Sequence, residues 1–109
     1  MKNKDFQLIY KKGKSYANKY FVMYLLANNK EENRLGVSVS KKVGNSVVRH
    51  RITRLVKESY RLNKDLLKKG YDIIIIARVA ANDKSYNEVE NSIIHLAKLH
   101  NIMKESLEN

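Results

Sequence analysis

The sequence predicts an α+β protein of two layers, with a mixed sheet and elements in the order α-β-β-α-β-α. Three observations carry this prediction. Residues 73–76 are four consecutive isoleucines, which is typical of a strand buried on both faces. Residues 34–40 alternate between apolar and small side chains, as a half-buried strand does. Two further stretches, which begin near Ser46 and Ser85, have apolar residues at helical spacing. With 109 residues, we expect residues 1–109 to form a single domain.

The first predicted elements are a short helix and a strand. Phe6, Ile9 and Tyr10 fall on one side of a helix that Gly13 ends. These three side chains either belong to the core or line a binding surface. Residues 19–27 are rich in aromatic and aliphatic side chains and predict a strand, and residues 28–33 form a polar turn after it. One face of this strand carries Tyr20, Val22, Tyr24 and Leu26, and the other carries Phe21, Met23 and Leu25.

The second predicted strand has one apolar face and one face of small residues. Residues 35, 37 and 39 are Leu, Val and Val, which point toward the core. The opposite face consists of Gly36, Ser38 and Ser40. Such a surface leaves room for a ligand to lie against it, although plain solvent exposure explains the pattern equally well.

A basic glycine turn leads from this strand into a long helix over residues 46 to about 69, roughly 35 Å long at 1.5 Å per residue. Gly44 and Asn45 suit a tight turn, Ser46 is the predicted N-cap, and Gly70 closes the helix. The predicted buried stripe is Val48, Ile52, Leu55, Val56, Ser59 and Leu66. The opposite side is a cationic stripe of His50, Arg54, Lys57, Arg61, Lys64 and Lys68.

The last two predicted elements are a central strand and a helix. Residues 71–79 are apolar on both faces, which favours a strand inside the sheet. Ser85 and Glu88 form a capping box, which starts the final helix. The predicted buried side of this helix is Val89, Ile93, Leu96 and Ala97, with His100 and Met103 beyond them.

The charge of the chain predicts a polyanionic partner. The formal net charge is +11, and residues 41–69 alone hold ten basic against two acidic side chains, whereas residues 70–109 hold four against six. Basic side chains at positions 41, 42, 49 and 51 surround the helix N-terminus, whose free N–H groups bind phosphate well. Nucleic acid is the expected partner. An anionic membrane competes weakly, because the apolar side of the helix is needed for the core.

Composition also bears on compartment and on catalysis. The chain has no cysteine and no apolar run of about 20 residues, so we expect a cytoplasmic protein. His95 and His100 lie in the acidic last third, away from the basic region, and His50 is interpreted as a neutral contact to RNA. The carboxylates are scattered among cations, so neither an acid–base pair nor a metal cage is apparent. We expect no catalytic residue and no metal ligand in the protein itself.

The run Ser40-Lys41-Lys42-Val43-Gly44-Asn45-Ser46-Val47-Val48-Arg49-His50-Arg51-Ile52-Thr53-Arg54-Leu55 closely resembles the signature of the bacterial ribonuclease P protein subunit. The hallmark of that family is an Arg-Asn-Arg core after a Gly-Asn turn. The resemblance continues in residues 3–6, 10–13, 21–24, 36–40 and 72–78, in the family order. It therefore spans nearly the whole chain.

The resemblance implies a fold, an activity and partners. The fold is the one that ribonuclease P proteins share with a domain of a small-subunit ribosomal protein, with a left-handed β-α-β crossover, against the usual right-handed preference. In the holoenzyme, an RNA-based endoribonuclease, the RNA subunit and its bound Mg²⁺ remove the 5′ leader of precursor tRNA. The protein binds the RNA subunit and the leader. It holds no cofactor tightly, and neither a membrane nor DNA is an expected partner.

The family roles carry over to two groups of residues. The residues that would bind the RNA subunit are Lys41, Lys42, Asn45, Arg49, His50, Arg51, Arg54, Lys57 and Arg61. The residues that would bind the leader are Phe6, Tyr10, Val22, Tyr24, Ser38 and Ser40. Aromatic rings suit a leader of variable sequence, because every base has a face on which a ring can stack.

Two departures from the family pattern bear on affinity. His50 stands where the family usually has Asn, so the hydrogen bond at this position changes its geometry. The chain also begins close to the first helix, whereas many relatives have more basic residues before it, so either part of the N-terminal contact is absent or the sequence is shortened. The alternative function is that of a ribosomal or other structured-RNA-binding protein, which needs no aromatic groove. A stand-alone protein ribonuclease is the third reading, and the missing acid–base pair disfavours it.

Overall fold

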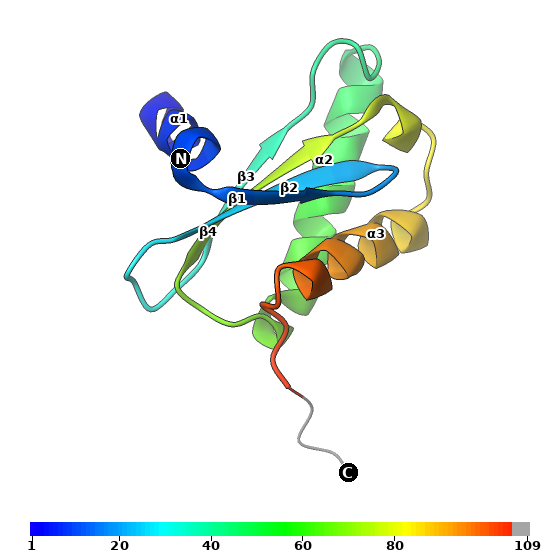
Figure 1. The fold of residues 1–109 in the computed structure, drawn as a ribbon. Coiled ribbons are helices and arrows are strands. Elements are labelled where there is room, and N and C mark those ends of the chain that lie inside the picture. The colour runs from blue at the N-terminus through cyan, green and yellow to red at the C-terminus, as the bar shows by residue number, and fades with distance from the viewer. Residues whose placement is uncertain (106–109) are drawn as a thin grey trace.

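The structure is a computed structural model that describes residues 1–105. Helices and strands follow one another along the chain as drawn in Figure 1. Their bounds are α1 Asn3–Lys12, β1 Lys14–Ala17, β2 Phe21–Ala27, β3 Arg34–Ser38, α2 Ser46–Asn63, β4 Tyr71–Ala77 and α3 Tyr86–Leu99. Short 3₁₀ turns at Lys64–Leu66 and Val79–Ala81 follow α2 and β4.

The four strands form one mixed sheet in the order β1-β2-β4-β3. β2 is antiparallel to both β1 and β4, whereas β3 is parallel to β4. α2 therefore makes the crossover between two neighbouring parallel strands, as predicted. The left-handed sense of this crossover stays a prediction from the resemblance.

The two faces of the sheet are covered differently (Figure 1). α2 and α3 pack on one face and bury the main core there, with Phe21, Met23, Ile73 and Ile75 contributed by the sheet. α1 lies on the other face, which carries the alternate residues of the same strands. Ile9 of α1 and Ile74 of β4 are fully buried there, outside the main core cluster. The small-residue face of β3 is thus partly covered by α1, with Gly36 buried and Ser38 half-buried.

The predicted fold class is confirmed, but the sheet has one strand more than predicted. β1 is a four-residue edge strand, and three of its four residues are exposed. Its sequence, Lys-Ser-Tyr-Ala, shows no apolar alternation, because its partner β2 supplies the hydrogen bonds and almost none of its side chains enter the core. The predicted strand at residues 19–27 starts two residues later, at Phe21.

The predicted long helix begins at Ser46 as expected, but its N-cap and its C-terminal end differ from the prediction. Asn45, and not Ser46, is the N-cap, and its side-chain oxygen accepts a hydrogen bond from the Val48 N–H at 3.0 Å. The helix ends at Asn63, where the amide side chain donates to the Ser59 carbonyl at 2.8 Å. Because the register changes after Asn63, Leu66 is 51% exposed and its neighbour Leu67 is buried in its place.

The other predicted helix boundaries are partly corrected and partly confirmed. Gly70 lies in the turn before β4 with φ +100°, well past the end of α2, so it serves the turn and not the helix. The Ser85–Glu88 capping box is confirmed, and so is the predicted buried side of α3 over residues 89–97. α3 ends at Leu99, so Ile102 is buried while Met103 packs only partly against the core.

Candidate nucleic-acid interface

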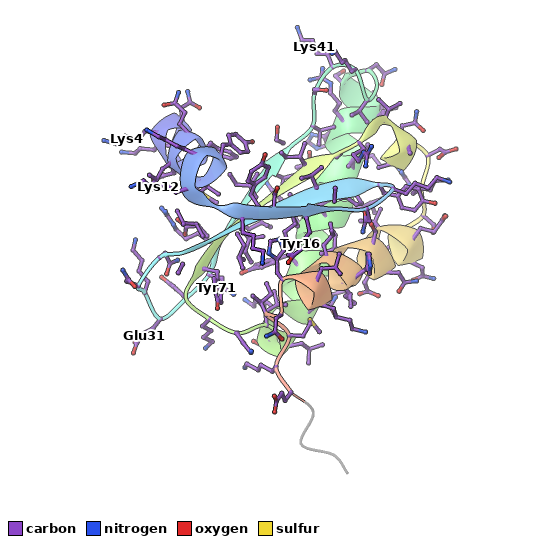
Figure 2. The ribbon with its side chains drawn as sticks, viewed as in Figure 1. Lys4, Lys12, Tyr16, Glu31, Lys41 and Tyr71 are labelled. Carbon is purple, nitrogen blue, oxygen red and sulfur yellow. The ribbon has the colours of Figure 1, made fainter. Side chains whose placement is uncertain are left out.

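The basic turn is a rigid loop between β3 and α2. Val43 is buried and anchors it, while Lys41 and Lys42 are exposed at its tip (Figure 2). A side chain at Gly44 would come within 2.7 Å of Val48 Cγ1, so glycine allows the turn to pack on the first turn of the helix. Together with the Asn45 cap, this contact fixes where the lysines sit relative to the N-terminus of α2.

The predicted cationic stripe lies along α2, but its members differ in exposure and in whether they form an ion pair. His50, Arg54 and Lys57 are exposed along α2. Arg61 is exposed too, but it donates two hydrogen bonds to Glu58, at 2.9 and 2.7 Å. This contact lowers the pKa of the Glu58 carboxyl and raises the pKa of Arg61, so the pair offers less charge to a partner. The free positive charge is therefore concentrated in the first half of α2.

Arg49 and Arg51 are half-buried at the edges of this surface. Arg51 donates to the backbone carbonyl of Lys84 at 2.8 Å, so it also ties α2 to the segment before α3. Lys64 and Lys68 lie beyond the end of the helix, and Lys68 donates to the Asn101 carbonyl at 3.2 Å. The stripe thus ends with α2, earlier than the sequence suggested.

At the position of the predicted aromatic groove, a second surface is formed by aromatic side chains where α1 lies on the sheet face opposite α2 and α3. The rings of Phe6 and Tyr10 on α1 have centroids 6.2 Å apart, and the ring of Tyr24 on β2 meets that of Tyr10 edge-on at 5.0 Å. Tyr10 is 39% exposed, whereas Ile9 between them is fully buried. Ile9 is therefore a core residue, and the two neighbouring rings are available at the surface.

The floor of this groove is set by the register of the strands. Val22, Ile76 and Ser38 lie in one row across the open face, and Tyr24, Ile74 and Gly36 lie in the next. A methyl group added to Gly36 would come within 2.6 Å of the Phe6 ring, so only glycine lets this ring lie on the strand. Burial raises the pKa of the Tyr10 hydroxyl, while its hydrogen bond with Ser38 acts the other way.

Ser40 lies outside the groove floor, contrary to the prediction. β3 ends at Ser38, and the Ser40 carbonyl accepts a hydrogen bond from the Val43 N–H at 3.1 Å. Ser40 is therefore exposed in the basic turn. Because β3 carries Ser38 at its end and the turn follows at once, the groove and the basic surface adjoin each other.

Sequence reasoning missed an ion-pair cluster in the third row of the same face. Arg34 donates from Nε and Nη2 to the two carboxylate oxygens of Asp72, at 2.8 and 2.6 Å. Asn28 donates to Asp72 as well, at 3.0 Å, and Asp5 of α1 lies 3.7 Å from the guanidinium of Arg34. The one signal in the sequence was a carboxylate inside an otherwise apolar strand.

The pKa directions in this cluster follow from its contacts. The Arg34 hydrogen bonds lower the pKa of Asp72 despite its burial, and Asp72 in turn raises the pKa of Arg34. The pKa of Asp5 is lowered first by the hydrogen bond from the Lys2 N–H and then by the charge of Arg34. All three groups are thus charged at neutral pH.

His95 on α3 and His100 just after it both contact other parts of the protein. His100 is half-buried, its Nε2 donates to the Met23 carbonyl at 2.8 Å, and its ring meets that of Tyr16 edge-on at 4.7 Å. Burial lowers the pKa of His100, so the ring is neutral at pH 7. His95 is exposed, and its Nδ1 lies 3.2 Å from the amide nitrogen of Asn18.

The described residues were also searched for metal sites and membrane spans. No three His, Cys, Asp or Glu side chains within residues 1–105 are grouped so that they could hold a metal ion. None of the helices in that range has the length and apolar character needed to cross a membrane.

Comparisons with known proteins agree with this geometry. The model of one family, Ribonuclease P, matches residues 1–101. The Ribonuclease P protein component of Lachnoclostridium phytofermentans is 56% identical over 104 residues, 95% of this chain and 90% of that protein. That of Alkaliphilus oremlandii is 51% identical over 97% of this chain and 93% of its own length.

Solved structures are similar as well. The RNase P protein of Staphylococcus aureus superposes with a TM-score of 0.86 at 43% identity, and 95% of each chain is covered. The RNase P protein of Thermotoga maritima superposes with a TM-score of 0.82 at 35% identity over 87% of this chain and 90% of that one. The similarity includes both surfaces described above, because the matched family range runs from α1 through α3.

Proposed function

The chain belongs to the ribonuclease P protein family, whose role is tRNA processing, and from this membership we propose how its two surfaces divide the work. The basic surface binds the RNA subunit of ribonuclease P. The aromatic groove binds the single-stranded 5′ leader of precursor tRNA. The RNA subunit performs the cleavage, and the protein contributes binding and orientation.

The assignment of the basic surface rests on charge and on rigidity. Lys41 and Lys42 are exposed in the turn before α2, Arg54 and Lys57 are exposed further along the helix, and Asn45 caps its N-terminus. Cationic side chains beside a helix N-terminus bind phosphate oxygens without reading sequence. Such a surface suits a folded RNA whose phosphates lie at fixed positions. Arg49, His50, Arg51 and Arg61 complete the proposed contact surface.

The assignment of the groove rests on aromatic rings that are exposed, as in Tyr10, or half-buried, as in Phe6 and Tyr24. Phe6, Tyr10 and Tyr24 form a ledge above a floor of small and apolar residues, which include Val22 and Ser38. Unpaired bases can stack on such a ledge, whereas duplex RNA offers it no free base face. This ledge is the observation that carries the proposal, because a protein that binds only rigid structured RNA does not need one.

The proposal extends to the site of Mg²⁺ binding and to the compartment in which the protein acts. We propose that the RNA partner holds the Mg²⁺ needed for cleavage, as the family membership implies. Mg²⁺ supplies a Lewis acid and an activated water when bound. The proposed place of action is the cytoplasm.

Reconstitution tests the proposed function. Protein freed of RNA by nuclease treatment should not cleave precursor tRNA. The same protein added to a bacterial ribonuclease P RNA at low Mg²⁺ should restore cleavage at the mature 5′ end. Specific 5′ cleavage by RNA-free protein would contradict the proposed division of roles.

A further inference from the structure

We propose that Arg34 is a positioning residue, which clamps α1 to the sheet and so holds Phe6 on Gly36 at the edge of the aromatic groove. The inference deepens the proposed function and rests on it where leader binding is concerned. The three charged residues of the clamp, Arg34, Asp72 and Asp5, belong to none of the predicted contacts with either RNA.

The two carboxylates that Arg34 contacts lie on different elements and differ in burial. Asp72 is fixed, because its side chain is 8% exposed in the central strand and accepts hydrogen bonds from Arg34 and Asn28. A fork of two parallel hydrogen bonds leaves the guanidinium little freedom to turn. The remaining contact of Arg34 is with Asp5, at 3.7 Å, and Asp5 is on α1. Arg34 thus connects a helix to the middle of the sheet.

The position of the clamp explains what it controls. Arg34 and Gly36 are on the same face of β3, two residues apart, and Asp5 and Phe6 are neighbours on α1. The Arg34–Asp5 contact therefore lies beside the Phe6–Gly36 contact. Apart from Ile9, α1 has no fully buried side chain, so the ion pair and the ring contact add to Ile9 in fixing how the helix lies on the sheet.

The sign of the effect separates positioning from electrostatics. Asp5→Asn removes a negative charge from a protein that binds a polyanion, so charge alone predicts stronger RNA binding. Loss of the clamp instead predicts a poorly placed Phe6 and weaker preference for precursor over mature tRNA. The amide oxygen of asparagine can still accept from the Lys2 N–H, which preserves the helix cap.

The experiment has an NMR arm and a binding arm. In the free protein, the Phe6 ring should shift the α-proton resonances of Gly36, and Phe6→Ala should abolish that shift. We expect Asp5→Asn to reduce the shift, and to lower the ratio of precursor to mature tRNA affinity in the reconstituted holoenzyme by about twofold to fivefold. Arg34→Lys, which keeps the charge and loses the fork, should act in the same direction.

A matched control and two outcomes decide the inference. Glu31→Gln makes the same change of charge in the exposed turn between β2 and β3 (Figure 2), and should leave both the Gly36 shift and the affinity ratio unchanged. An unchanged Gly36 shift in Asp5→Asn overturns the clamp. Where Phe6→Ala lowers the affinity ratio, a reduced shift with an unchanged ratio in Asp5→Asn overturns the role of the clamp in leader binding. If Phe6→Ala itself keeps the wild-type ratio, leader binding by the groove is wrong, while the Gly36 shift still reports whether the clamp holds the helix.

Discussion

Tyr10 and Ile9 are neighbours on α1 with opposite surroundings, which makes them a matched pair for mutation. Tyr10 is 39% exposed and meets Tyr24, whereas Ile9 has no exposed surface. Tyr10→Ala should weaken precursor tRNA binding relative to mature tRNA, by the roughly 1–3 kcal/mol that stacking one base contributes.

Ile9→Ala is the control for this prediction. It should destabilise the protein by about 2–5 kcal/mol and affect both tRNAs equally, because it removes a buried side chain. Thermal melts and the two affinities distinguish these results. Equal weakening of both tRNAs by Tyr10→Ala, with a lowered melting temperature, would mean that the ring acts only in packing.

His100 should make stability depend on pH. Burial lowers its pKa in the folded state below the usual 6.5, so near that pH the unfolded chain binds a proton that the folded protein does not. The free energy of unfolding should therefore be highest above about pH 6.5 and fall as the pH drops through 6.5 toward the folded-state pKa. Urea titrations from pH 8 to pH 5 would measure this slope.

Two variants check the source of the slope. His100→Gln should flatten it, because the titrating group is gone. His95→Gln, on the exposed side of the same helix, should retain it. A slope that survives in His100→Gln would assign the pH dependence to other groups.

At the scale of the elements, α2 is expected to bind RNA through its first half. Arg54 is exposed and makes no ion pair among the described residues, so Arg54→Ala should remove one phosphate contact with little effect on the helix. The slope of log K for RNA-subunit binding against log salt should become shallower by roughly 0.7–0.9. Lys98→Ala removes one positive charge from an exposed position on α3, outside the basic surface. It should leave the slope unchanged.

The contacts of the other two arginines change what their substitution would mean. Arg51 donates to the Lys84 carbonyl, so Arg51→Ala should cost stability as well as RNA affinity. Arg49 is half-buried, so Arg49→Ala should remove packing as well as charge. A salt slope unaffected by Arg54→Ala would place RNA binding elsewhere on the protein.

The elements were predictable wherever a side-chain pattern determines them. The isoleucine run of β4 and the Ser85–Glu88 capping box were visible because burial and capping each demand particular residues. β1 was not visible, since an edge strand is held by backbone hydrogen bonds that any residue except proline can make. The end of α2 was overestimated because helical spacing continued past Asn63.

The site was predictable to a similar extent and for similar reasons. The basic turn consists of residues close in sequence, and the resemblance to a family brought the aromatic residues of α1 and β2 together although β1 lies between them. The Arg34–Asp72–Asp5 cluster joins three separate segments, so only the register of β3 against β4 reveals it. Their roles in binding stay predictions.

At the scale of the whole molecule, the end of the described chain closes the core. Ile102 is buried, its carbonyl accepts from the Lys68 N–H at 2.6 Å, and the Lys104 N–H donates to the Leu66 carbonyl at 2.8 Å. These contacts fasten the segment after α2 beside α3. Ile102→Ala should therefore lower the free energy of unfolding by about 2–5 kcal/mol.

Leu99→Ala is the comparison for this prediction. Leu99 is 42% exposed at the end of α3, so its truncation should change stability by no more than about 0.5 kcal/mol. Chemical denaturation of the two variants gives both numbers. Similar stabilities for Ile102→Ala and the wild type would show that the closing segment contributes little.

The place of β4 in the sheet has a consequence for synthesis of the protein. β2 and β3 follow each other in the chain, yet each pairs with β4 and not with the other. A nascent chain that ends before Tyr71 can form only the β1–β2 hairpin, and an isolated hairpin is marginally stable. Residues 1–69 carry 18 basic and five acidic side chains. Until β4 has emerged from the ribosome, the chain therefore presents a polycation without a completed sheet, which attracts any nearby RNA through charge alone.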